Sequence, residues 1–508
     1  MMPVHKPQEG VKLLSDLLEG IATVSAADDC AIKGVALDSR QLQPGYLFLA
    51  CSGSVQRGHD YIAAAVAQGA VAVCYEVAEG ETAFLSAQVN NVPLLAVRKL
   101  SQQAGLIAER FYGCPSRELF VVGITGTNGK TSCSQFLAHA LNSEQRPCGV
   151  IGTLGNGLVD RLTPGSHTTP DAVTLHGLLA ELREAGARSV TLEVSSHALD
   201  QGRVAGVSFA AAVFTNLSRD HLDYHGDMAA YGEAKLRLFH APELRYAVVN
   251  GDDEFSKAIL ATLRAGVTAV SYGLGTAMAA DIPHVQGRVV QLSREGLVMT
   301  VHTPWGEGQL HSSLLGRFNA SNLLAVLATL LVSGMPFAEA LQHLTQVRPV
   351  SGRMECFGGD GHRPLVVVDY AHTPDALQQV LTALREHCSG KLWCVFGCGG
   401  DRDRGKRPLM GAVAAHLADR VIVSDDNPRS EDPARIVADI LAGIDDKQAI
   451  TVIHDRDAAI AAAIAQAGVD DVVLVAGKGH ETTQQIGEKK LPFRDQAAVQ
   501  RYLAEAVT

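Results

Sequence analysis

The sequence predicts an α/β protein of three domains, and three observations support this prediction. The 508 residues are about three times the length of a typical domain. Residues 119–141 read as a buried strand, a glycine-rich loop and a helix in direct succession. Short apolar strands then alternate with helices, and the alternation starts afresh near residue 349. Such alternation indicates parallel sheets with helices on both faces.

The first domain, residues 1–110, is expected to be a small α/β unit. Its strand and helix patterns fall at four places: 35–40, 44–50, 62–68 and 70–75. The first of these runs into the polar segment Asp38-Ser39-Arg40. Taken alone, that segment is also typical of a turn with a solvated arginine.

The second domain, residues 111–348, is expected to hold a doubly wound sheet. Residues 285–312 instead alternate as short strands with glycine turns, which predicts a small antiparallel appendage. A long apolar helix follows, and Asn319 stands where its N-terminal cap is expected. The strands of the doubly wound part are predicted at 119–122, 189–194, 211–215 and 246–250.

The loop after the first of these strands has the chemistry of a phosphate site. It reads Gly126-Thr127-Asn128-Gly129-Lys130-Thr131-Ser132. In a strand–loop–helix unit of this kind, backbone N–H groups and the positive helix end face an anion, and Lys130 adds a mobile charge. Thr131 would place its hydroxyl on the magnesium that accompanies phosphates. The usual P-loop has a glycine where this chain has Ile124, so the pattern indicates a nucleoside triphosphate site of an unusual P-loop type.

The third domain, residues 349–508, is expected to be Rossmann-like. Its strands are predicted at 364–369, 392–397, 420–424, 452–453 and 472–476. Polar clusters fall where four of these strands should end, and ligands of such sheets bind at the carboxyl ends of strands. We therefore expect this edge of the sheet to bind a ligand. The clusters are Asp369-Tyr370-Ala371-His372, Gly399-Gly400-Asp401-Arg402, Asp426-Asn427-Pro428-Arg429 and Gly477-Lys478-Gly479-His480-Glu481.

The composition describes an ordinary globular protein, with 47% hydrophobic and 19% charged residues. No apolar run approaches the ~20 residues of a membrane helix, and the first residues lack a signal-peptide core. Ten scattered cysteines fit a reducing compartment better than a disulfide framework, so a cytoplasmic protein is expected. The net charge of −11 argues against a general nucleic-acid binder.

Two further segments of the central domain carry residues suited to metal or acid–base chemistry. Glu193 ends a strand, and a carboxylate at that position beside the phosphate loop is suited to bind magnesium. A solvent-exposed carboxylate at a strand end is the alternative interpretation. Residues 216–226 are dense in titratable groups that include His221. No nucleophile-elbow glycines surround Ser218, which argues against a Ser/His/Asp hydrolase. The segment could instead supply metal ligands, or it could be a solvated loop. Lys235, by itself, reads as an exposed helix lysine.

Together these motifs resemble the Mur ligases, a family of enzymes that build the peptide of bacterial cell-wall precursors with ATP. The resemblance runs from residue 38 to residue 481 in the order of the family. It also accounts for the loop, because these ligases use G-T-x-G-K-T. The motifs that carry the resemblance are 38–40, 126–131, 193–197, 215–221, Lys235, 319–322 and 369–374.

The resemblance implies an ATP-dependent ligase that adds meso-diaminopimelate to the D-glutamate side-chain carboxylate of UDP-N-acetylmuramoyl-L-Ala-D-Glu. The carboxylate would first attack the ATP γ-phosphate to form an acyl phosphate, and the amine of the incoming amino acid would then displace phosphate. Phosphate is a far better leaving group than oxide, so catalysis would consist mostly of positioning and charge neutralisation. The implied cofactors are ATP and magnesium, and a monomer is expected.

The resemblance also implies roles for individual residues. Lys130 would neutralise the transferred phosphoryl group, and Thr131 with Glu193 would hold one magnesium ion. His221 and a carbamylated Lys235 would hold a second, because a carbamate offers an anionic oxygen that an ammonium lacks. The implied ATP contacts are residues 126–132 with Asn319, Arg353 and Asp369.

Substrate contacts are implied in all three domains. Arg429 can grip the far carboxylate that distinguishes diaminopimelate from lysine, and Glu481 is suited to the far ammonium. His167 stands where the family often has asparagine, so the family's asparagine contact does not carry over directly to this position. The uridine end would meet Leu37, Ser39, Ser54, Val55 and Gln56. The sugar and peptide would meet His167, Thr168, Thr169, Ser195, Gln201 and Arg203. The amino acid would meet Arg402, Asp426, Asn427, Pro428, Arg429, Gly477 and Glu481.

Two other functions compete with this interpretation. A folylpolyglutamate synthase shares the phosphate loop and the carbamylated lysine but would have no separate UDP-binding unit at the N-terminus. A non-catalytic nucleotide switch would leave Glu193, His221 and the strand-end clusters without a role. With ligands spread over three domains, hinges near residues 110 and 348 are expected, with closure that excludes water.

Overall fold

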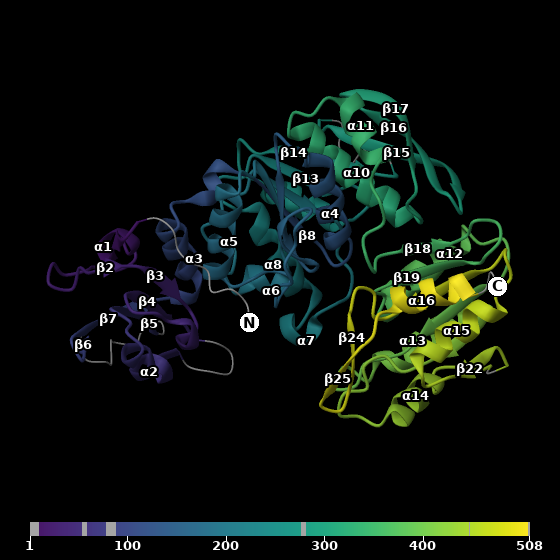
Figure 1. Ribbon diagram of the computed structural model, residues 1–508. Helices are drawn as coiled ribbons and strands as arrows, with labels where there is room; N and C mark the ends of the chain where they lie inside the picture. Colours follow the sequence, from purple (N-terminus) through teal and green to yellow (C-terminus); the bar gives the residue numbers. More distant parts are fainter. Residues whose placement is uncertain (1–9, 53–57, 78–87, 276–280, 447, 506–508) are drawn as a thin grey trace. The chain divides into compact units, whose positions relative to one another are not determined.

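Figure 1 shows the computed structural model, which describes residues 10–52, 58–77, 88–275, 281–446 and 448–505. The chain divides into two compact units, residues 1–270 and 271–508. None of the helices in the described ranges has both the length and the apolar character needed to cross a membrane.

The first unit begins with a five-stranded sheet of order β3-β4-β5-β7-β6. Strands β3, β4, β5 and β7 run parallel, and β6 is an antiparallel edge. This sheet confirms the expected small α/β unit. Its elements are β1 (Lys12–Leu13), α1 (Leu14–Leu17), β2 (Ala31–Ile32), β3 (Gly34–Ala36), β4 (Tyr46–Ala50), α2 (Ile62–Ala67), β5 (Ala72–Val77), β6 (Gln88–Val89), β7 (Val92–Arg98) and α3 (Leu100–Phe111).

The first predicted strand runs into the expected polar loop, and it ends earlier than expected. It ends at Ala36, and a single 3₁₀ turn follows over Ser39–Gln41. The Asp38 carboxylate accepts a hydrogen bond from the Arg40 backbone N–H at 2.9 Å and so caps this turn. Asp38 also pairs with the Arg40 guanidinium at 2.7 Å on the surface.

A second sheet of the first unit has the order β10-β9-β11-β8-β12-β13. Strands β9, β11, β8, β12 and β13 run parallel, as a doubly wound sheet requires, and β10 is an antiparallel edge. The four predicted strands are confirmed as β8, β11, β12 and β13, and β8 is longer than expected. The elements are β8 (Phe120–Thr125), α4 (Lys130–Leu141), β9 (Cys148–Gly152), β10 (Gly155–Leu158), α5 (Ala172–Glu184), β11 (Ser189–Glu193), α6 (Ser196–Asp200), β12 (Ala211–Phe214), α7 (Leu222–His225), α8 (Met228–Phe239), β13 (Tyr246–Asn250) and α9 (Phe255–Thr262).

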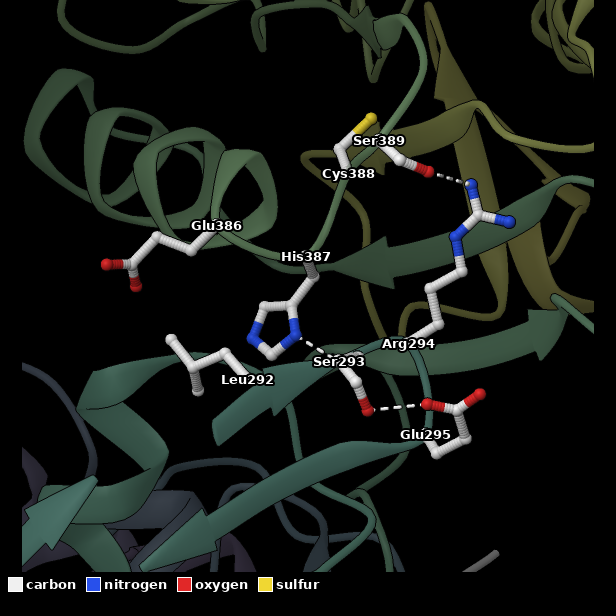
Figure 2. A pocket seen from close by; sticks show the side chains of 8 residues that line it. All are labelled: Leu292, Ser293, Arg294, Glu295, Glu386, His387, Cys388 and Ser389. Carbon is white, nitrogen blue, oxygen red and sulfur yellow. Dashed lines mark hydrogen bonds between the residues drawn. The ribbon is translucent and has the colours of Figure 1, made fainter. Parts of the chain in front are cut away.

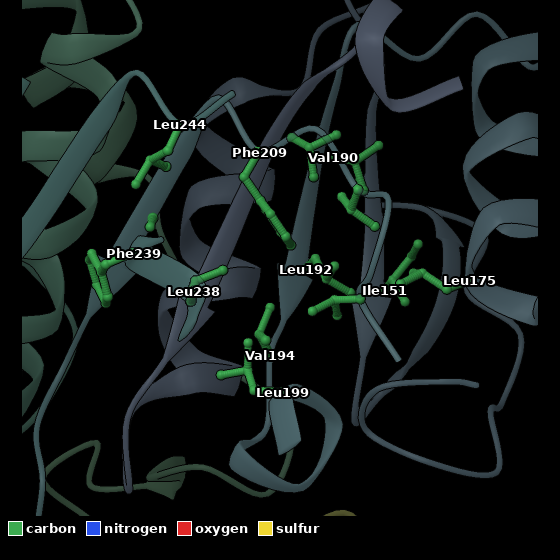
Figure 3. Packing of buried hydrophobic residues seen from close by; sticks show 14 of the residues in the cluster. Ile151, Leu175, Val190, Leu192, Val194, Leu199, Phe209, Leu238, Phe239 and Leu244 are labelled. Atoms are coloured by element: carbon green, nitrogen blue, oxygen red, sulfur yellow. The ribbon is translucent and has the colours of Figure 1, made fainter. Parts of the chain in front are cut away.

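Both faces of this sheet are covered. Figure 3 shows one apolar cluster, to which Val190 and Leu192 of β11, Leu175 of α5 and Phe239 of α8 all belong. The alternate residue Thr191 faces the other side, where its hydroxyl accepts a hydrogen bond from Ser134 of α4 at 3.0 Å. Because both faces are packed, every residue of β11 is buried.

The second unit begins with the antiparallel appendage that the glycine turns predict. Residues 271–273 of β14 pair in parallel with β15, and β15, β16 and β17 then form antiparallel pairs. Helix α10 is buried almost throughout, and it begins at Arg317 after Gly316, so Asn319 lies inside the first turn instead of capping it. The elements are β14 (Thr268–Gly273), β15 (His284–Ser293), β16 (Gly296–Thr303), β17 (Gly306–Ser312), α10 (Arg317–Val332) and α11 (Phe337–Thr345).

A six-stranded sheet of order β18-β19-β23-β20-β21-β22 forms the rest of the second unit. Its five predicted strands are confirmed as β19, β20, β21, β22 and β23, which run parallel. The antiparallel edge β18 and the hairpin β24–β25 were not predicted. The elements are β18 (Glu355–Gly358), β19 (Leu365–Asp369), α12 (Pro374–Arg385), β20 (Leu392–Phe396), α13 (Lys406–Leu417), β21 (Arg420–Val423), α14 (Pro433–Leu441), β22 (Ile450–Val452), α15 (Arg456–Gln466), β23 (Val472–Ala476), β24 (Thr483–Ile486), β25 (Lys489–Pro492) and α16 (Asp495–Glu505).

Candidate functional site

The glycine loop joins β8 to α4 in a conformation that depends on glycine. Gly126 and Gly129 have φ values of 151° and 85°, which side chains disfavour. A Cβ atom on Gly126 would also overlap the Thr215 hydroxyl. The loop is held from the next strand, because the N–H groups of Thr127 and Asn128 donate to the Asn216 carbonyl and side-chain oxygens at 2.8 and 2.9 Å.

Lys130 and the first turn of α4 give the loop its positive character. The Lys130 ammonium donates to the Gly126 and Thr127 carbonyls, both at 2.8 Å, and so lies folded over the loop. No side chain caps α4 at Gly129. The N–H groups of the first turn therefore stay oriented for an anion, as in other helix N-termini that bind phosphate.

Glu193 meets the phosphate loop at the end of β11 and is fully buried. Its carboxylate accepts hydrogen bonds from the Thr131 hydroxyl at 2.8 Å and from the Thr153 hydroxyl and N–H at 3.1 and 2.8 Å. A Cβ atom on Gly152 would overlap the same carboxylate, so glycine permits this close approach. The structure thus brings Thr131 and Glu193 together, with Thr153 as a third oxygen donor that the sequence interpretation missed.

A row of hydroxyls continues from this carboxylate. The Thr168 and Thr153 hydroxyls lie 3.0 Å apart, and the Thr169 hydroxyl donates to the Glu193 carbonyl at 2.8 Å. The Ser195 N–H donates to Thr169 at 3.1 Å, and its hydroxyl caps α6. The row links the implied peptide contacts to the phosphate loop.

Gln201 and Arg203 lie beside this row, and His167 does not join it. The Arg203 guanidinium donates to the Thr169 carbonyl at 3.0 Å and to the Gln201 side chain at 2.6 and 2.9 Å. His167 is exposed and contacts the neighbouring Ser166 hydroxyl at 2.9 Å.

Lys235 is buried, with 1% of its surface exposed, so its interpretation as an exposed helix lysine is wrong. Its ammonium lies 4.2 Å from the centre of the Tyr231 ring. Burial, and then the positive charge of Lys130, hold the pKa of Lys235 well below its ordinary value, although Asp220 acts in the opposite direction. A lysine with such a lowered pKa has a larger neutral, nucleophilic fraction.

His221 belongs to a cluster of rings beside Lys235. His197 contacts His221 and His225 at centroid distances of 4.8 and 5.4 Å, and Tyr224 packs on His197 at 4.2 Å. Burial, followed by the neighbouring histidines, lowers the pKa of His197 to about 4. Burial also lowers the pKa of His221. In the described part of the chain, no group of three or more His, Cys, Asp or Glu side chains is arranged to hold a metal ion.

In the second unit, Asp369 and Arg353 meet at the end of β19. The buried Asp369 carboxylate accepts the N–H groups of Met354 and Ala371, both at 2.8 Å. Burial raises the pKa of Asp369, and the charge of Arg353 opposes this shift. The Arg353 guanidinium lies 4.4 Å from the centre of the Tyr370 ring, and its buried Nη1 has no hydrogen-bond partner among the described residues.

Asn319, in the first turn of α10, is also buried. Its amide donates to the Leu315 carbonyl at 2.9 Å, and its oxygen accepts from Asn322 at 3.1 Å. Asn319 belongs to the second unit, whereas the phosphate loop belongs to the first.

The strand-end loops of the second unit converge around residues 426–429. The Arg429 guanidinium donates to the Gly400 carbonyl at 2.6 Å, and the Asn427 amide donates to Glu481 at 2.8 Å. Asp426 is buried, which raises its pKa, and a Cβ atom on Gly477 would press against its carboxylate. Arg402 is exposed on the adjoining loop.

The residues implied for the uridine end are only partly described. Leu37 packs against the apolar cluster of the five-stranded sheet, and Ser39 is buried at the start of the 3₁₀ turn. Ser54, Val55 and Gln56 lie outside the described residues.

A separate pocket of about 320 Å³ lies in the second unit, between the turn after β15 and the end of α12. Figure 2 shows the His387 ring directed at Ser293, whose carbonyl lies 2.5 Å from Nδ1. Its lining residues are Leu292, Ser293, Arg294, Glu295, Glu386, His387, Cys388 and Ser389.

Three family models match successive parts of the chain. The Mur ligase family, catalytic domain, matches residues 31–112, the Mur ligase middle domain matches 124–330, and the Mur ligase, glutamate ligase domain, matches 352–479.

Curated relatives match over almost the full length. The UDP-N-acetylmuramoyl-L-alanyl-D-glutamate--2,6-diaminopimelate ligase of Alkalilimnicola ehrlichii is 51% identical over 496 residues, 97% of this chain and 99% of the relative. The ligase of the same name from Coxiella burnetii is 50% identical over 484 residues, 95% of this chain and 98% of the relative.

Solved structures agree with these relatives. A structure of a ligase with the same name has a TM-score of 0.73 and 36% identity and covers 98% of this chain and 100% of its own. A Mycobacterium tuberculosis folylpolyglutamate synthase, complexed with ADP and AMPPCP, has a TM-score of 0.58 and 20% identity over 73% of this chain and 91% of its own, which is a likeness of fold alone. On the strength of the family models and of relatives that are half identical from end to end, the chain belongs to the Mur ligase family.

Proposed function

We propose that this chain is an ATP-dependent ligase that adds meso-diaminopimelate to the D-glutamate side-chain carboxylate of UDP-N-acetylmuramoyl-L-Ala-D-Glu. The observation that carries the proposal is the 51% identity, over 97% of the chain, to a relative named for this substrate and this amino acid. The hydrogen bond from Arg429 to the Gly400 carbonyl supports diaminopimelate as the amino acid. This bond holds the guanidinium at the strand ends, where it could bind the far carboxylate of diaminopimelate.

The phosphate loop is proposed to hold the triphosphate of ATP. In the reaction, an oxygen of the D-glutamate carboxylate forms a bond to the γ-phosphorus, and ADP leaves. The amine of diaminopimelate then attacks the acyl carbon and loses a proton. Phosphate leaves from the same carbon, and the amide bond remains. Lys130 and the N–H groups at the start of α4 would neutralise the charge on the transferred group, as oriented donors do in phosphoryl transfer.

Magnesium fits the residues at the end of β11. Glu193 is a fully buried carboxylate whose hydrogen-bond partners, within the described residues, are hydroxyls and one N–H group and include no cation. A buried charge without a cation is costly, and carboxylate and hydroxyl oxygens are the ligands that magnesium prefers. Thr131 and Glu193 would hold the ion, which would supply charge neutralisation to the phosphates.

Lys235 is proposed to carry a carbamate that serves a second magnesium ion together with His221. The lowered pKa of Lys235 supports this, since only the neutral amine reacts with carbon dioxide. The positive charge of Lys130 acts on both Lys235 and His221, which indicates that all three belong to one site.

The test of the function is phosphate release from ATP in the presence of the UDP-dipeptide and either diaminopimelate or lysine. Release that requires the UDP-dipeptide and diaminopimelate supports the proposal. Release that ignores both amino acids contradicts it, and release driven by a folate substrate would favour the folylpolyglutamate synthase alternative. Nucleotide binding without release would favour the non-catalytic switch.

Arg429→Ala tests the choice of amino acid. Loss of a buried partner of the substrate carboxylate costs about 2–5 kcal/mol, so kcat/KM for diaminopimelate should fall by at least about thirtyfold. Arg420→Ala, which changes an exposed arginine of the same sheet, serves as the matched control and should retain full activity. Unchanged turnover of diaminopimelate by the Arg429 variant would contradict the pocket assignment.

A further inference from the structure

Lys478 is a fully buried lysine in the loop after β23, and none of the proposed roles uses it. Its ammonium donates three hydrogen bonds, to the Asn427 side-chain oxygen at 3.1 Å, the Glu481 carboxylate at 2.8 Å and the Thr483 carbonyl at 2.8 Å. A lysine ammonium has three protons, so these acceptors satisfy it completely. Lys478 therefore links the loop after β23 to the loop that carries Asn427, and its ammonium has no proton left to donate to a ligand.

The bonds of Lys478 close a triangle with Asn427 and Glu481. The Asn427 amide donates to the same Glu481 oxygen, Oε2, that accepts from Lys478. The Asn427 oxygen accepts from the N–H of Gln485 at 2.9 Å as well as from Lys478, which sets the orientation of its amide. These hydrogen bonds restrict the orientation of all three side chains.

The triangle leaves one face of Glu481 directed outward. Within the described residues, the hydrogen bonds of this carboxylate go to Oε2, and 32% of the side chain is exposed. Burial would raise the pKa of Glu481, but the hydrogen bond and charge of Lys478, together with Asn427 and His480, outweigh it and lower the pKa below its ordinary value. The outer oxygen is thus an anionic acceptor with a defined position.

We propose that Lys478 is a positioning residue for amino-acid selection, which holds Asn427 and Glu481 so that Oε1 of Glu481 receives the far ammonium of the incoming amino acid. The inference rests on the proposed function and deepens it. Arg429 lies two residues after Asn427, so the same triangle also fixes the start of the loop that carries the guanidinium. A diamino acid with a far carboxylate would then meet one cation and one anion at set positions, whereas a monoamino acid would leave Glu481 without its partner.

The experiment compares Lys478→Met with wild-type protein in the ligase assay. We expect the KM for diaminopimelate to rise by at least about tenfold, because the Glu481 and Asn427 orientations are lost. The KM values for ATP and the UDP-dipeptide should stay within about twofold of wild type. The exposed Lys489→Met in the hairpin that follows is the matched control and should leave all three KM values unchanged.

Two readouts separate positioning from a merely structural role. Without Lys478 the effect of burial on the pKa of Glu481 is opposed only by Asn427 and His480, so the acid limb of kcat/KM for diaminopimelate should move to higher pH. In a cycle with Glu481→Gln, the effects of the two substitutions should be clearly less than additive, because Lys478 acts in part through Glu481. Equal changes in all three KM values, or additive effects in the cycle, would overturn the inference.

Lys478→Arg covers the case in which the methionine variant does not fold. It keeps the cation but not the geometry of the ammonium, so a raised KM for diaminopimelate with an unchanged KM for ATP supports the inference. Equal rises in both would overturn it. Failure of the proposed function is a different result, because wild-type protein would then release no diaminopimelate-dependent phosphate.

Discussion

His176 is a buried histidine of α5 with no exposed surface. Its Nε2 lies 2.9 Å from the Ala205 carbonyl and must carry the ring proton, while the buried Nδ1 has no partner among the described residues. Burial lowers the pKa of His176 to about 4, and the bond to Ala205 opposes this only in part. The folded protein therefore holds this ring neutral at a pH where the unfolded chain would protonate it.

Acidification should destabilise the protein through this one ring. The unfolded state binds the extra proton between pH 6.5 and pH 4, so stability falls as the pH drops through that window, by about 2 kcal/mol at pH 5. His176→Gln keeps a donor for Ala205 without a titrating ring. The variant's midpoint of thermal unfolding should fall less between pH 7 and pH 5 than that of the wild type. His240→Gln, at an exposed histidine, is the control, and equal falls in all three proteins would contradict the assignment.

Among the elements, α12, β15 and α10 meet at the His387 ring. Its Nδ1 lies 2.5 Å from the Ser293 carbonyl, and its Nε2 accepts the Gly316 N–H at 2.9 Å, which requires the neutral ring protonated on Nδ1. Gly316 precedes the first turn of α10. A single ring thus satisfies two backbone groups from two other elements, and Arg294 adds a bond from its guanidinium to the Val469 carbonyl at 2.7 Å.

His387→Leu should destabilise this junction. It leaves the Ser293 carbonyl and the buried Gly316 N–H without their partner, which costs about 1–3 kcal/mol for each group that water cannot reach. Glu386→Gln changes only the adjacent surface pair with Arg317 and should cost less than about 1 kcal/mol. Chemical unfolding of both variants gives the comparison. If the two variants lost equal stability, the ring would not be the main contact.

At the scale of the whole molecule, the domain boundaries at 110 and 348 and the hinges near them are proposals. Helix α3 runs through residue 110, from Leu100 to Phe111, and its Gln102 side chain donates to the Asp200 carbonyl at 3.1 Å. The residues proposed to bind the UDP-dipeptide, ATP and the amino acid lie on elements of all three domains. A reaction between these substrates would therefore require the domains to approach one another and exclude water.

Closure should be visible in solution. Small-angle X-ray scattering with the UDP-dipeptide, a non-hydrolysable ATP analogue and diaminopimelate together should give a smaller radius of gyration than the free protein. Lys130→Ala removes the phosphate-loop cation, so this variant should compact less at the same ligand concentrations. An unchanged scattering profile, with binding verified by calorimetry, would count against the hinges.

Much of the fold follows from local patterns in the chain. Strands β11, β12 and β13 and strands β19, β20, β21 and β23 of the C-terminal sheet are short apolar runs, and a run of that kind is visible without knowledge of its neighbours. Strands β18, β24 and β25 were missed because they are exposed or half-buried and have no apolar run. The polar segment at 38–40 was expected to form a loop or turn, but the cap that Asp38 provides was not predicted, because a single capping side chain has no periodic signature.

The site divides in the same way. The glycine loop is a contiguous motif whose chemistry requires glycine, lysine and threonine at set spacing, so the proposed phosphate site and its order relative to the strand-end clusters can be predicted from the sequence alone. Only the tertiary structure decided that Thr153 joins Thr131 at Glu193, that Lys235 is buried, and that Lys478 closes a triangle with Asn427 and Glu481. The physical reason is that burial and hydrogen bonding between distant segments depend on how whole elements pack, whereas a motif and an apolar period are properties of neighbouring residues.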